Sequence, residues 1–597
     1  MGRRPLAGWR AGVTATQRGI AATAGPRYRG MTAGRAPHIV VVGGGLAGVA
    51  AAIALCDAGA RVTLAEARPR LGGATCSFTR GSLTVDNGQH IFLRCCTAYR
   101  GLLDRLGMTS NTVLQEKFDV RVLTPAGAAR LRRRGLPAPF HLASALATYP
   151  LLSPRERAGA VRAALAFLRL DPADPGTDDR RLGDWLAAHG QGPRARRGLW
   201  DLFVVSALNI AGDDASLALA AMVIKTALLG GPGAADIGVP TVPLGDLHGR
   251  AAGALLRRLG ATVLTGAKVT AISLAANEPG PAVTQARDSD IADGPGSGDV
   301  RGAGGAGGAG RVRGRDQSGG FMVRLGGPAA YPDAGAEGAA GWGLDYLDGF
   351  PADGTGGDDP AGSSRDTVYR DTVYTDTVYT DTVYSDTVYR DTATTHGSGS
   401  ERFLAADGVV LAVPPQQAAN LLPASAAGPP GSAADPASWR GLGESPIVNV
   451  HVVYDRPVTG LRFAAAVDSP VQWIFDRTKV SGCEQGQYLA ISLSAADEYA
   501  GQRSQRLRAT FLPAIEQILP AARTARVSDF FVTRERRATF RQIPGTAALR
   551  PGAATPLSGL VLAGAWTDTG WPDTMEGAVR SGLEAARNTL ASLGVRR

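Results

Sequence analysis

The chain has 597 residues, of which 44% are hydrophobic and 19% are charged. This length exceeds what one hydrophobic core accommodates, so we expect two or more domains. The formal net charge is +10, but the basic residues are spread along the chain and no basic run alternates with aromatic residues. The composition therefore argues against nucleic-acid binding, while a basic surface is compatible with contact to anionic lipid.

The cysteines are odd in number and irregularly spaced, at Cys56, Cys76, Cys95, Cys96 and Cys483. No zinc-ligand spacing is present, which predicts no metal site and a reduced, cytoplasmic compartment. Residues 1–36 are rich in Arg, Gly and Ala and lack acidic residues. They are typical of a transit peptide, and Met31 equally permits a later start codon. We expect this extension to be disordered or to precede the true start.

A dinucleotide-binding pattern begins at residue 39. A β-branched run at residues 39–42 leads into Gly-x-Gly-x-x-Gly at Gly43, Gly45 and Gly48. Gly43 permits the tight turn, Gly45 lets the backbone approach a pyrophosphate, and Gly48 lets the helix pack closely on the sheet. Because free N–H groups at the helix start face the anion, the backbone of Leu46 and Ala47 is also expected to contact the cofactor.

The segments after the glycines complete this pattern. Residues 49–58 are predicted to form a helix, and residues 61–64 a second strand that ends near Glu66. The Glu66 carboxylate is expected to accept hydrogen bonds from a ribose. Residues 39–56 are also apolar enough to suggest a membrane span, but the glycines, second strand and acid argue against one.

The rest of the chain divides by composition. Residues 101–240 are predicted to be mainly helical, and residues 241–272 a helix followed by strands. Residues 276–400 are rich in Gly, Asp, Ser and Thr, apart from one predicted strand at Phe321–Leu325. Asp-Thr-Val-Tyr recurs there five times from Asp366 with a five-residue period. A small β-solenoid is one interpretation, but the Gly-rich flanks favour a largely disordered insert.

Regular structure is predicted again from residue 403. The predicted elements are strands at 407–415, 448–454, 472–475, 488–493 and 560–564, and a closing helix at 575–590. We therefore predict an α/β protein in which a discontinuous Rossmann-type domain binds the cofactor and a mixed α+β domain binds the substrate. The first comprises residues 37–100, 241–275, 401–420 and 551–595; the second comprises residues 101–240 and 421–550.

A second glycine pair extends the fingerprint as Glu66-x-Arg68-x-x-x-Gly72-Gly73. This pattern resembles the FAD enzymes of the amine-oxidase and carotenoid-desaturase superfamily. The strand with paired prolines at 409–415 and the closing motif at 564–581 resemble the same superfamily. The resemblance implies that FAD is the cofactor and that it contacts Arg68, Gly72, Gly73, Ala74, Gly88, Gln89, Val269, Gly564, Ala565, Trp571 and Met575, besides the first glycine motif.

One branch of the superfamily fits best. The segments 86–90 (DNGQH), 207–209 (ALN), 472–477 (QWIFDR), 535–540 (ERRATF) and 569–578 (TGWPDTMEGA) resemble hydroxysqualene dehydroxylase. This implies that the enzyme replaces the allylic hydroxyl of hydroxysqualene with hydride to give squalene for hopanoid synthesis. Two rival functions stay open: a carotenoid or phytoene-type desaturase or isomerase, and a non-catalytic prenyl-lipid carrier like the GDP-dissociation inhibitors. No residue pattern identifies the external electron donor.

Two positions depart from the superfamily pattern. Ala74 stands where an Arg often follows the glycine pair, and Ala565 stands where an acid usually follows the late Ala-Gly. One side-chain contact to the cofactor is therefore missing, and weaker retention of FAD is a hypothesis that a flavin-to-protein ratio tests.

The implied reaction needs a dry pocket and a proton donor for the departing hydroxyl. His90 is the candidate donor and Asp86 the second catalytic candidate; a structural role for His90 and a turn-capping or flavin-contacting role for Asp86 are the alternatives. Asn209 is expected to be either a polar group of the pocket or a cap, and capping is favoured. Asp568 and Glu576 lie near the flavin end of the closing motif, where surface or helix-start roles are favoured over catalysis. Four aromatic residues are candidates either for the pocket wall or for ordinary core: Trp473, Phe475, Trp566 and Trp571.

Two apolar stretches between Arg-rich segments, residues 140–152 and 160–170, remain. They are interpreted either as peripheral contacts with the inner face of a membrane, which a water-insoluble triterpene would require, or as ordinary amphipathic core helices.

Overall fold

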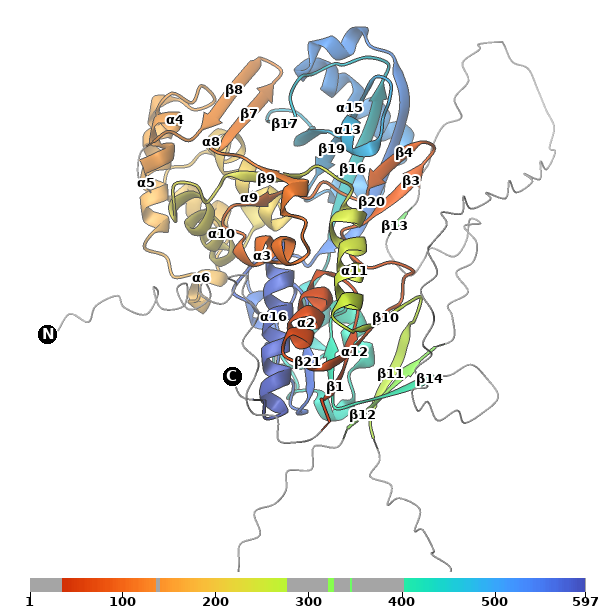
Figure 1. Cartoon of the computed structure of the whole chain (residues 1–597). Helices are drawn as coiled ribbons and strands as arrows, with labels where there is room; N and C mark the ends of the chain where they lie inside the picture. Colours follow the sequence, from red (N-terminus) through yellow and green to blue (C-terminus); the bar gives the residue numbers. More distant parts are fainter. Residues whose placement is uncertain (1–34, 136–139, 276–319, 327–343, 346–401, 596–597) are drawn as a thin grey trace, which may run out of the picture.

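A computed structural model describes residues 35–135, 140–275, 320–326, 344–345 and 402–595 (Figure 1). The amino-terminal extension before residue 35 and the pentapeptide repeat lie outside these residues. The predicted strand within the insert is confirmed, because Phe321–Leu325 forms strand β12. It pairs antiparallel with β11 (Val269–Leu274) and β14 (Arg402–Ala406), so the two sides of the insert meet in one small sheet.

A five-stranded parallel sheet forms the lower half of the molecule in Figure 1. Its strand order is β10-β2-β1-β15-β21. The strands come from four separated parts of the chain, because long excursions leave and re-enter the sheet. Their bounds are His38–Val42 (β1), Arg61–Glu66 (β2), Thr262–Thr265 (β10), Gly408–Leu411 (β15) and Leu560–Leu562 (β21).

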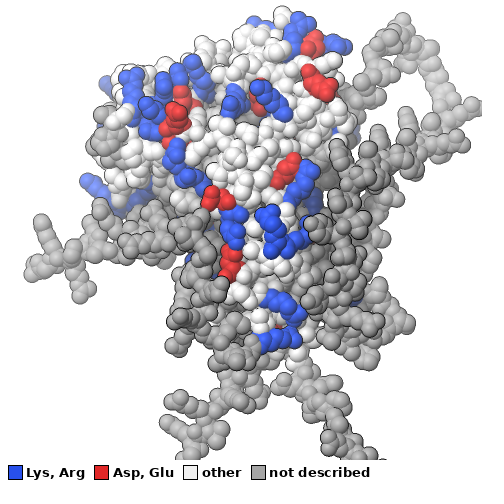
Figure 2. Space-filling view, viewed as in Figure 1, with Lys and Arg blue, Asp and Glu red and all other residues white. Residues whose placement is uncertain are grey.

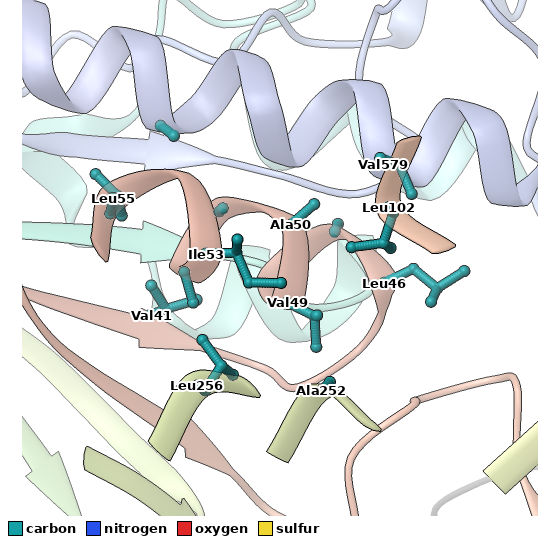
Figure 3. Close-up of a cluster of buried hydrophobic side chains, with 14 of the residues drawn as sticks. Val41, Leu46, Val49, Ala50, Ile53, Leu55, Leu102, Ala252, Leu256 and Val579 are labelled. Carbon is teal, nitrogen blue, oxygen red and sulfur yellow. The ribbon is translucent and has the colours of Figure 1, made fainter. Parts of the chain in front are cut away.

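Three helices pack together against this five-stranded sheet. Helix α2 (Leu46–Asp57) lies between α16 (Met575–Ser592) and α11 (Ala251–Arg258), as Figure 3 shows. Residues 39–56 therefore fold as a strand, a turn and a buried helix rather than as a membrane span. The contact between α2 and α16 is close, because a Cβ at Gly582 would lie 2.1 Å from the Ala47 carbonyl oxygen.

The upper half of Figure 1 contains an eight-stranded mixed sheet and a cluster of helices. The sheet order is β13-β20-β16-β19-β18-β17-β7-β8. The predicted strands at 448–454, 472–475 and 488–493 are confirmed within it. The strands of this sheet are Asp119–Thr124 (β7), Gly127–Arg132 (β8), Leu344–Asp345 (β13), Ser445–Tyr454 (β16), Phe463–Ala466 (β17), Trp473–Asp476 (β18), Gln487–Leu493 (β19) and Val527–Thr539 (β20).

The prediction that residues 101–240 are mainly helical is wrong at their two ends. The β7–β8 hairpin joins the large sheet, where β7 pairs with β17. Strand β9 (Ile237–Pro240) pairs with β5 (Phe92–Leu93) and β6 (Thr112–Leu114). Between these ends the prediction holds. The main helices there are α4 (Ala143–Ala147), α5 (Pro154–Phe167), α7 (Leu182–Ala188), α9 (Asp201–Leu208), α10 (Leu217–Val223) and the π-helix η5 (Ile224–Leu229).

The structure contains further helices and one hairpin outside these two large sheets. They are the hairpin of β3 (Ser77–Arg80) and β4 (Leu83–Asp86), helix α3 (Thr97–Arg105), the π-helix η6 (Gly245–Arg250), α12 (Pro415–Leu421) and α15 (Ser504–Ile518). Within the described residues no helix is long and apolar enough to cross a bilayer.

Candidate functional site

The glycine motif forms a cradle of bare backbone at the carboxyl end of β1. Gly43 has a φ of +103°, and a Cβ there would lie 2.3 Å from the Ala412 carbonyl oxygen. A Cβ on Gly48 would lie 1.9 Å from the Gly43 carbonyl oxygen. Both positions therefore require glycine for packing. At Gly45, by contrast, the nearest atom to an added Cβ is 3.9 Å away, so this glycine leaves space that a ligand would use.

The amino terminus of α2 is open toward this space. Its N-cap residue is Gly45, and no side chain caps the first N–H groups of the helix. Gly73, with a φ of +57°, faces Gly45 so closely that a Cβ on it would lie 2.9 Å from the Gly45 Cα. The two glycine motifs thus meet backbone to backbone. Uncapped N–H groups beside side-chain-free backbone fit a pyrophosphate.

Glu66 joins the two motifs. Its carboxylate accepts hydrogen bonds from the Gly44 N–H at 2.6 Å and the Arg68 N–H at 2.8 Å. Its carbonyl accepts from the Ala267 N–H, which brings the start of β11 and the buried Val269 next to it. Arg68 itself reaches the Gly73 carbonyl at 3.5 Å. These residues, predicted to hold the adenosine end, therefore lie together.

The predicted residues for the flavin end also meet. Asn87 donates to the carbonyl of the exposed Ala74, and Gly88 lies beside the His90 ring. Two buried polar atoms nearby, Gln89 Nε2 and Asn449 Oδ1, have no hydrogen-bond partner within the described part of the chain. A polar ring edge would satisfy such atoms, so the residues present fit a flavin.

A buried arginine that the sequence analysis missed shapes the closing motif. The Arg550 guanidinium donates to the carbonyls of Ala565, Trp566, Thr567 and Trp571 at 2.5 to 3.3 Å. It gathers the loop that follows Gly564, whose own N–H donates to Ser581. Ala565 therefore has a structural contact through its carbonyl.

The two catalytic candidates differ in their surroundings. Asp86 is buried and forms an ion pair with Arg477; it also accepts from the Ser77 hydroxyl at 2.5 Å and the Leu244 N–H at 2.9 Å. Burial raises the pKa of Asp86, and the Arg477 guanidinium opposes this shift. The geometry of Asp86 is that of a structural carboxylate that joins β4 to residues far along the chain.

His90 is not among the residues that line the pocket described below. Burial, together with Arg477, lowers the pKa of His90 to about 4. The ring is therefore neutral near pH 7, which weakens it as a proton donor.

Glu535 shares the flavin end of the site and hydrogen-bonds Asn87. Burial raises the pKa of this carboxyl from 4.5 to about 7, although Arg68 and Arg70 pull it down. Because the folded state binds the proton more tightly than the unfolded state, the stabilisation is complete below pH 4.5 and is lost as the pH rises through 7. We expect cofactor-free protein to lose roughly 2–3 kcal/mol more unfolding free energy between about pH 5 and about pH 8 than Glu535→Gln, measured with urea. Equal losses in the two proteins would contradict this.

An apolar pocket lies between the closing motif and the helical cluster. The pocket has a volume of about 1080 Å³, which includes the space at its open mouth. Its wall is almost entirely apolar. Trp473 and Trp571 line it, whereas Phe475 and Trp566 belong to the core. Residues that the sequence analysis missed form most of the wall, including Phe118, Leu202, Phe203, Met222 and Ile237. Thr574, Met575 and Glu576, at the start of α16, bring the cofactor motif to the pocket.

The other polar candidates have structural partners. Asn209 ends α9 in a left-handed conformation and bonds to Ser445, Thr539 and the Ala495 N–H. Glu576 is buried and accepts from the first N–H groups of α3 and from Arg580. Asp568 is exposed. Their expected capping and surface roles fit these positions.

A parallel α/β sheet, an open glycine cradle and two buried polar atoms without partners, Gln89 Nε2 and Asn449 Oδ1, together define an FAD-binding oxidoreductase fold. Residues 46–296 and 333–590 match the flavin containing amine oxidoreductase family, and residues 5–81 match the pyridine nucleotide-disulphide oxidoreductases. The chain belongs to the flavin containing amine oxidoreductase family, and its cofactor is FAD.

Individual relatives match over parts of the chain. Hydroxysqualene dehydroxylase from Rhodopseudomonas palustris is 37% identical over 186 residues, which are 31% of this chain and 39% of that protein. The chain thus spans about two-fifths of the length of that curated relative. Zeta-carotene desaturase from Synechocystis is 29% identical over 18% of this chain and 22% of its own length. Cyclohexylamine oxidase from Brevibacterium oxydans shares the fold with a TM-score of 0.56 and 18% identity, over 94% of this chain and 100% of its own.

Proposed function

We propose that this chain is an FAD-dependent hydroxysqualene dehydroxylase, which converts the allylic alcohol to squalene. The observation that carries the proposal is the apolar pocket, whose wall includes residues of the cofactor's closing motif. A wall with few polar groups suits a triterpene and excludes water from a reactive allylic carbon. The partial identity to hydroxysqualene dehydroxylases supports the same substrate class.

The chemistry divides between cofactor and protein. Reduced FAD supplies a hydride to the allylic carbon. The protein holds the substrate chain against apolar side chains such as Phe118, Phe203 and Trp473, and keeps water from the reacting end. A group on the wall must also protonate the leaving hydroxyl, because hydroxide is a poor leaving group.

Product analysis tests this function against its nearest rival, a carotenoid-type desaturase. We expect protein reduced with dithionite under anaerobic conditions to convert hydroxysqualene to squalene, detected by mass spectrometry. Oxidised protein is expected to leave phytoene unchanged. New conjugated double bonds in phytoene, without squalene from hydroxysqualene, would contradict the proposal and favour the desaturase. Purified protein without flavin that binds prenyl lipid would favour a carrier.

We further propose that helix α5 places the protein on an anionic membrane surface. Within the described residues six large apolar side chains are exposed, and Val161, Leu165 and Leu168 on one side of α5 and its end are three of them. The opposite side of α5, with Ala163 and Phe167, is buried in the core. Of the two Arg-flanked stretches, residues 160–170 therefore present an apolar outer face, whereas Tyr149 and Leu152 in the first are core residues.

Charge and position support a lipid partner for this face. Arg155, Arg162 and Arg169 are exposed along α5, and Figure 2 shows further Lys and Arg side chains over the neighbouring β8 and α4. The Lys225 ammonium donates to the Leu170 carbonyl at 2.6 Å, and the adjacent Thr226 lines the pocket. The apolar face thus lies next to a wall of the pocket, as suits a substrate that is dissolved in the membrane.

Liposome flotation tests this contact. We expect the protein to float with vesicles that contain anionic lipid, and the double variant Leu165→Glu/Leu168→Glu to remain in the soluble fraction because it loses apolar contact and adds negative charge. Leu274→Glu, an exposed apolar residue outside α5, is the matched control and is expected to float. Flotation of the double variant at the wild-type level would contradict the proposal.

A further inference from the structure

Two neighbouring thiols, Cys95 and Cys96, form part of the pocket wall. Both side chains line the pocket, both residues are half-buried, and neither is in a disulfide. They are adjacent in the chain, directly before or at the start of helix α3, and their side chains hydrogen-bond each other. Because the residues are only half-buried and the pocket has an open mouth, a small reagent can reach these sulfur atoms.

The other cysteines differ from this pair. Cys56, Cys76 and Cys483 have no cysteine beside them in the chain, and burial raises the pKa of each of their thiols. A raised pKa leaves less of the nucleophilic thiolate at pH 7. These three thiols are therefore expected to react slowly, and they provide internal references for the pair.

Cys95 and Cys96 also differ from each other. A hydrogen bond from Cys96 lowers the pKa of the Cys95 thiol, although burial opposes this shift. The same hydrogen bond, together with burial, raises the pKa of the Cys96 thiol. The shared hydrogen therefore stays with Cys96, and Cys95 is the first of the two to become a thiolate. A thiolate beside a protonated thiol is the arrangement of an attacking cysteine and its resolving partner.

The backbone fixes the pair at this position. The Cys95 N–H donates to the Ala234 carbonyl at 3.1 Å. The Cys96 N–H donates to the Leu93 carbonyl at 2.9 Å. Cys96 is the N-cap residue of α3, but its side chain makes no capping hydrogen bond, because the Glu576 carboxylate accepts from N–H groups at the helix start instead. The Cys96 thiol is therefore available to Cys95.

We propose that Cys95 and Cys96 form a reversible redox pair in the pocket wall, which hydrogen peroxide oxidises to a disulfide. The Cys95 thiolate attacks one oxygen of the peroxide, the O–O bond breaks, and the departing hydroxide takes a proton to become water. The Cys96 sulfur then attacks the resulting Cys95 sulfenic acid, and its proton leaves with the hydroxyl as a second water. The two electrons that the sulfur atoms lose reduce the peroxide. The proposal is independent of which substrate the pocket takes.

The geometry of neighbouring residues makes this disulfide easy to reduce. Adjacent Cα atoms are about 3.8 Å apart, whereas most disulfides join Cα atoms at least about 4.4 Å apart. Closing the bond between Cys95 and Cys96 therefore strains the chain, and strained disulfides are the labile, regulatory ones. We accordingly expect dithiothreitol, a simple dithiol reductant, to restore both thiols.

Peptide mapping tests the pair in flavin-loaded wild-type protein. Trypsin cleavage after Arg94 and Arg100 releases residues 95–100, which contain both thiols of the pair and no other cysteine. After treatment with hydrogen peroxide, we expect this peptide to be lighter by two hydrogens and unreactive toward iodoacetamide. After dithiothreitol, we expect iodoacetamide to alkylate both of its cysteines. The peptides that contain Cys56 and Cys483 are expected to remain alkylatable throughout.

Serine variants separate the roles of the two thiols. In Cys96→Ser the Cys95 sulfenic acid has no resolving partner, so we expect dimedone, which traps sulfenic acids, to label Cys95. In Cys95→Ser we expect Cys96 to remain alkylatable at peroxide concentrations that close the wild-type pair. Cys483→Ser is the matched control, and its peptide 95–100 is expected to respond as in the wild type. The flavin spectrum and thermal midpoint verify that each variant is folded.

Three outcomes with the wild-type protein, which need no variant, would overturn the proposal. Alkylation of both Cys95 and Cys96 after peroxide treatment would show that the two thiols only pack. Sulfinic or sulfonic acid at Cys95 without a disulfide would show that Cys96 does not resolve the sulfenic acid. A disulfide from either thiol to Cys56, Cys76 or Cys483 would show that the pair is not the redox unit. None of these readouts requires squalene formation, so they are distinct from a failure of the proposed function.

Discussion

Gly45→Ala is expected to weaken FAD binding by about 100-fold or more while leaving the protein folded. The φ of Gly45 is −73°, which alanine adopts freely, and the nearest atom to the added Cβ is 3.9 Å away. The methyl group therefore costs the protein little but occupies the space where the pyrophosphate meets the uncapped start of α2. Fluorescence titration of cofactor-free protein with FAD measures the change.

Gly192→Ala is the matched control for this prediction. Gly192 also precedes a helix, and nothing lies within 4 Å of an added Cβ, so FAD affinity and the thermal midpoint are both expected to stay at wild-type values. Gly48→Ala is expected to differ from both, because its Cβ would lie 1.9 Å from a carbonyl oxygen and the protein would lose stability. Undiminished FAD affinity in Gly45→Ala would show that the cofactor's phosphates lie elsewhere.

Asp86→Ala is expected to reduce the unfolding free energy by about 3–5 kcal/mol, because it leaves the Arg477 guanidinium buried without its partner. The side chains of Asp86 and Arg477 are 3% and 10% exposed, so water cannot replace the lost carboxylate. Ser77 and the Leu244 N–H lose their acceptor as well. Denaturation with urea, followed by circular dichroism, measures the loss.

The control for Asp86→Ala is Asp214→Ala, which breaks the exposed ion pair with Arg181. These side chains are 52% and 61% exposed, and the expected cost is below about 1 kcal/mol. A folded Asp86→Ala protein with wild-type stability but no turnover would contradict the structural role and restore Asp86 as a catalytic candidate.

The cofactor site was largely predictable because its signals are local. Each glycine of the first motif has a task that one backbone turn explains, and Glu66 is the last residue of the second strand. Strand β12 was predictable for the same reason, since a five-residue segment with four apolar residues interrupts a Gly-rich segment. Local patterns of this kind can be recognised without knowledge of contacts with distant parts of the chain.

The catalytic assignments depended on contacts that no local pattern reveals. Asp86 is 391 residues from Arg477, its partner. The sequence analysis selected His90 because it follows a recognisable motif. An alternation of apolar and polar residues in β7 and β8 did signal strands, with Val120 and Val122 buried, but the surrounding Ala- and Leu-rich segments suggested helix.

The central claim is that reduced FAD in the glycine cradle acts on an allylic alcohol held in the adjoining apolar pocket. A single turnover in D₂O tests it most directly, with protein reduced anaerobically by dithionite and then mixed with hydroxysqualene. Because the transferable hydrogen of reduced flavin exchanges with solvent, the account predicts squalene that carries one deuterium on the former carbinol carbon, formed as the flavin absorbance returns. Reduced flavin that persists alongside unchanged hydroxysqualene would contradict the account.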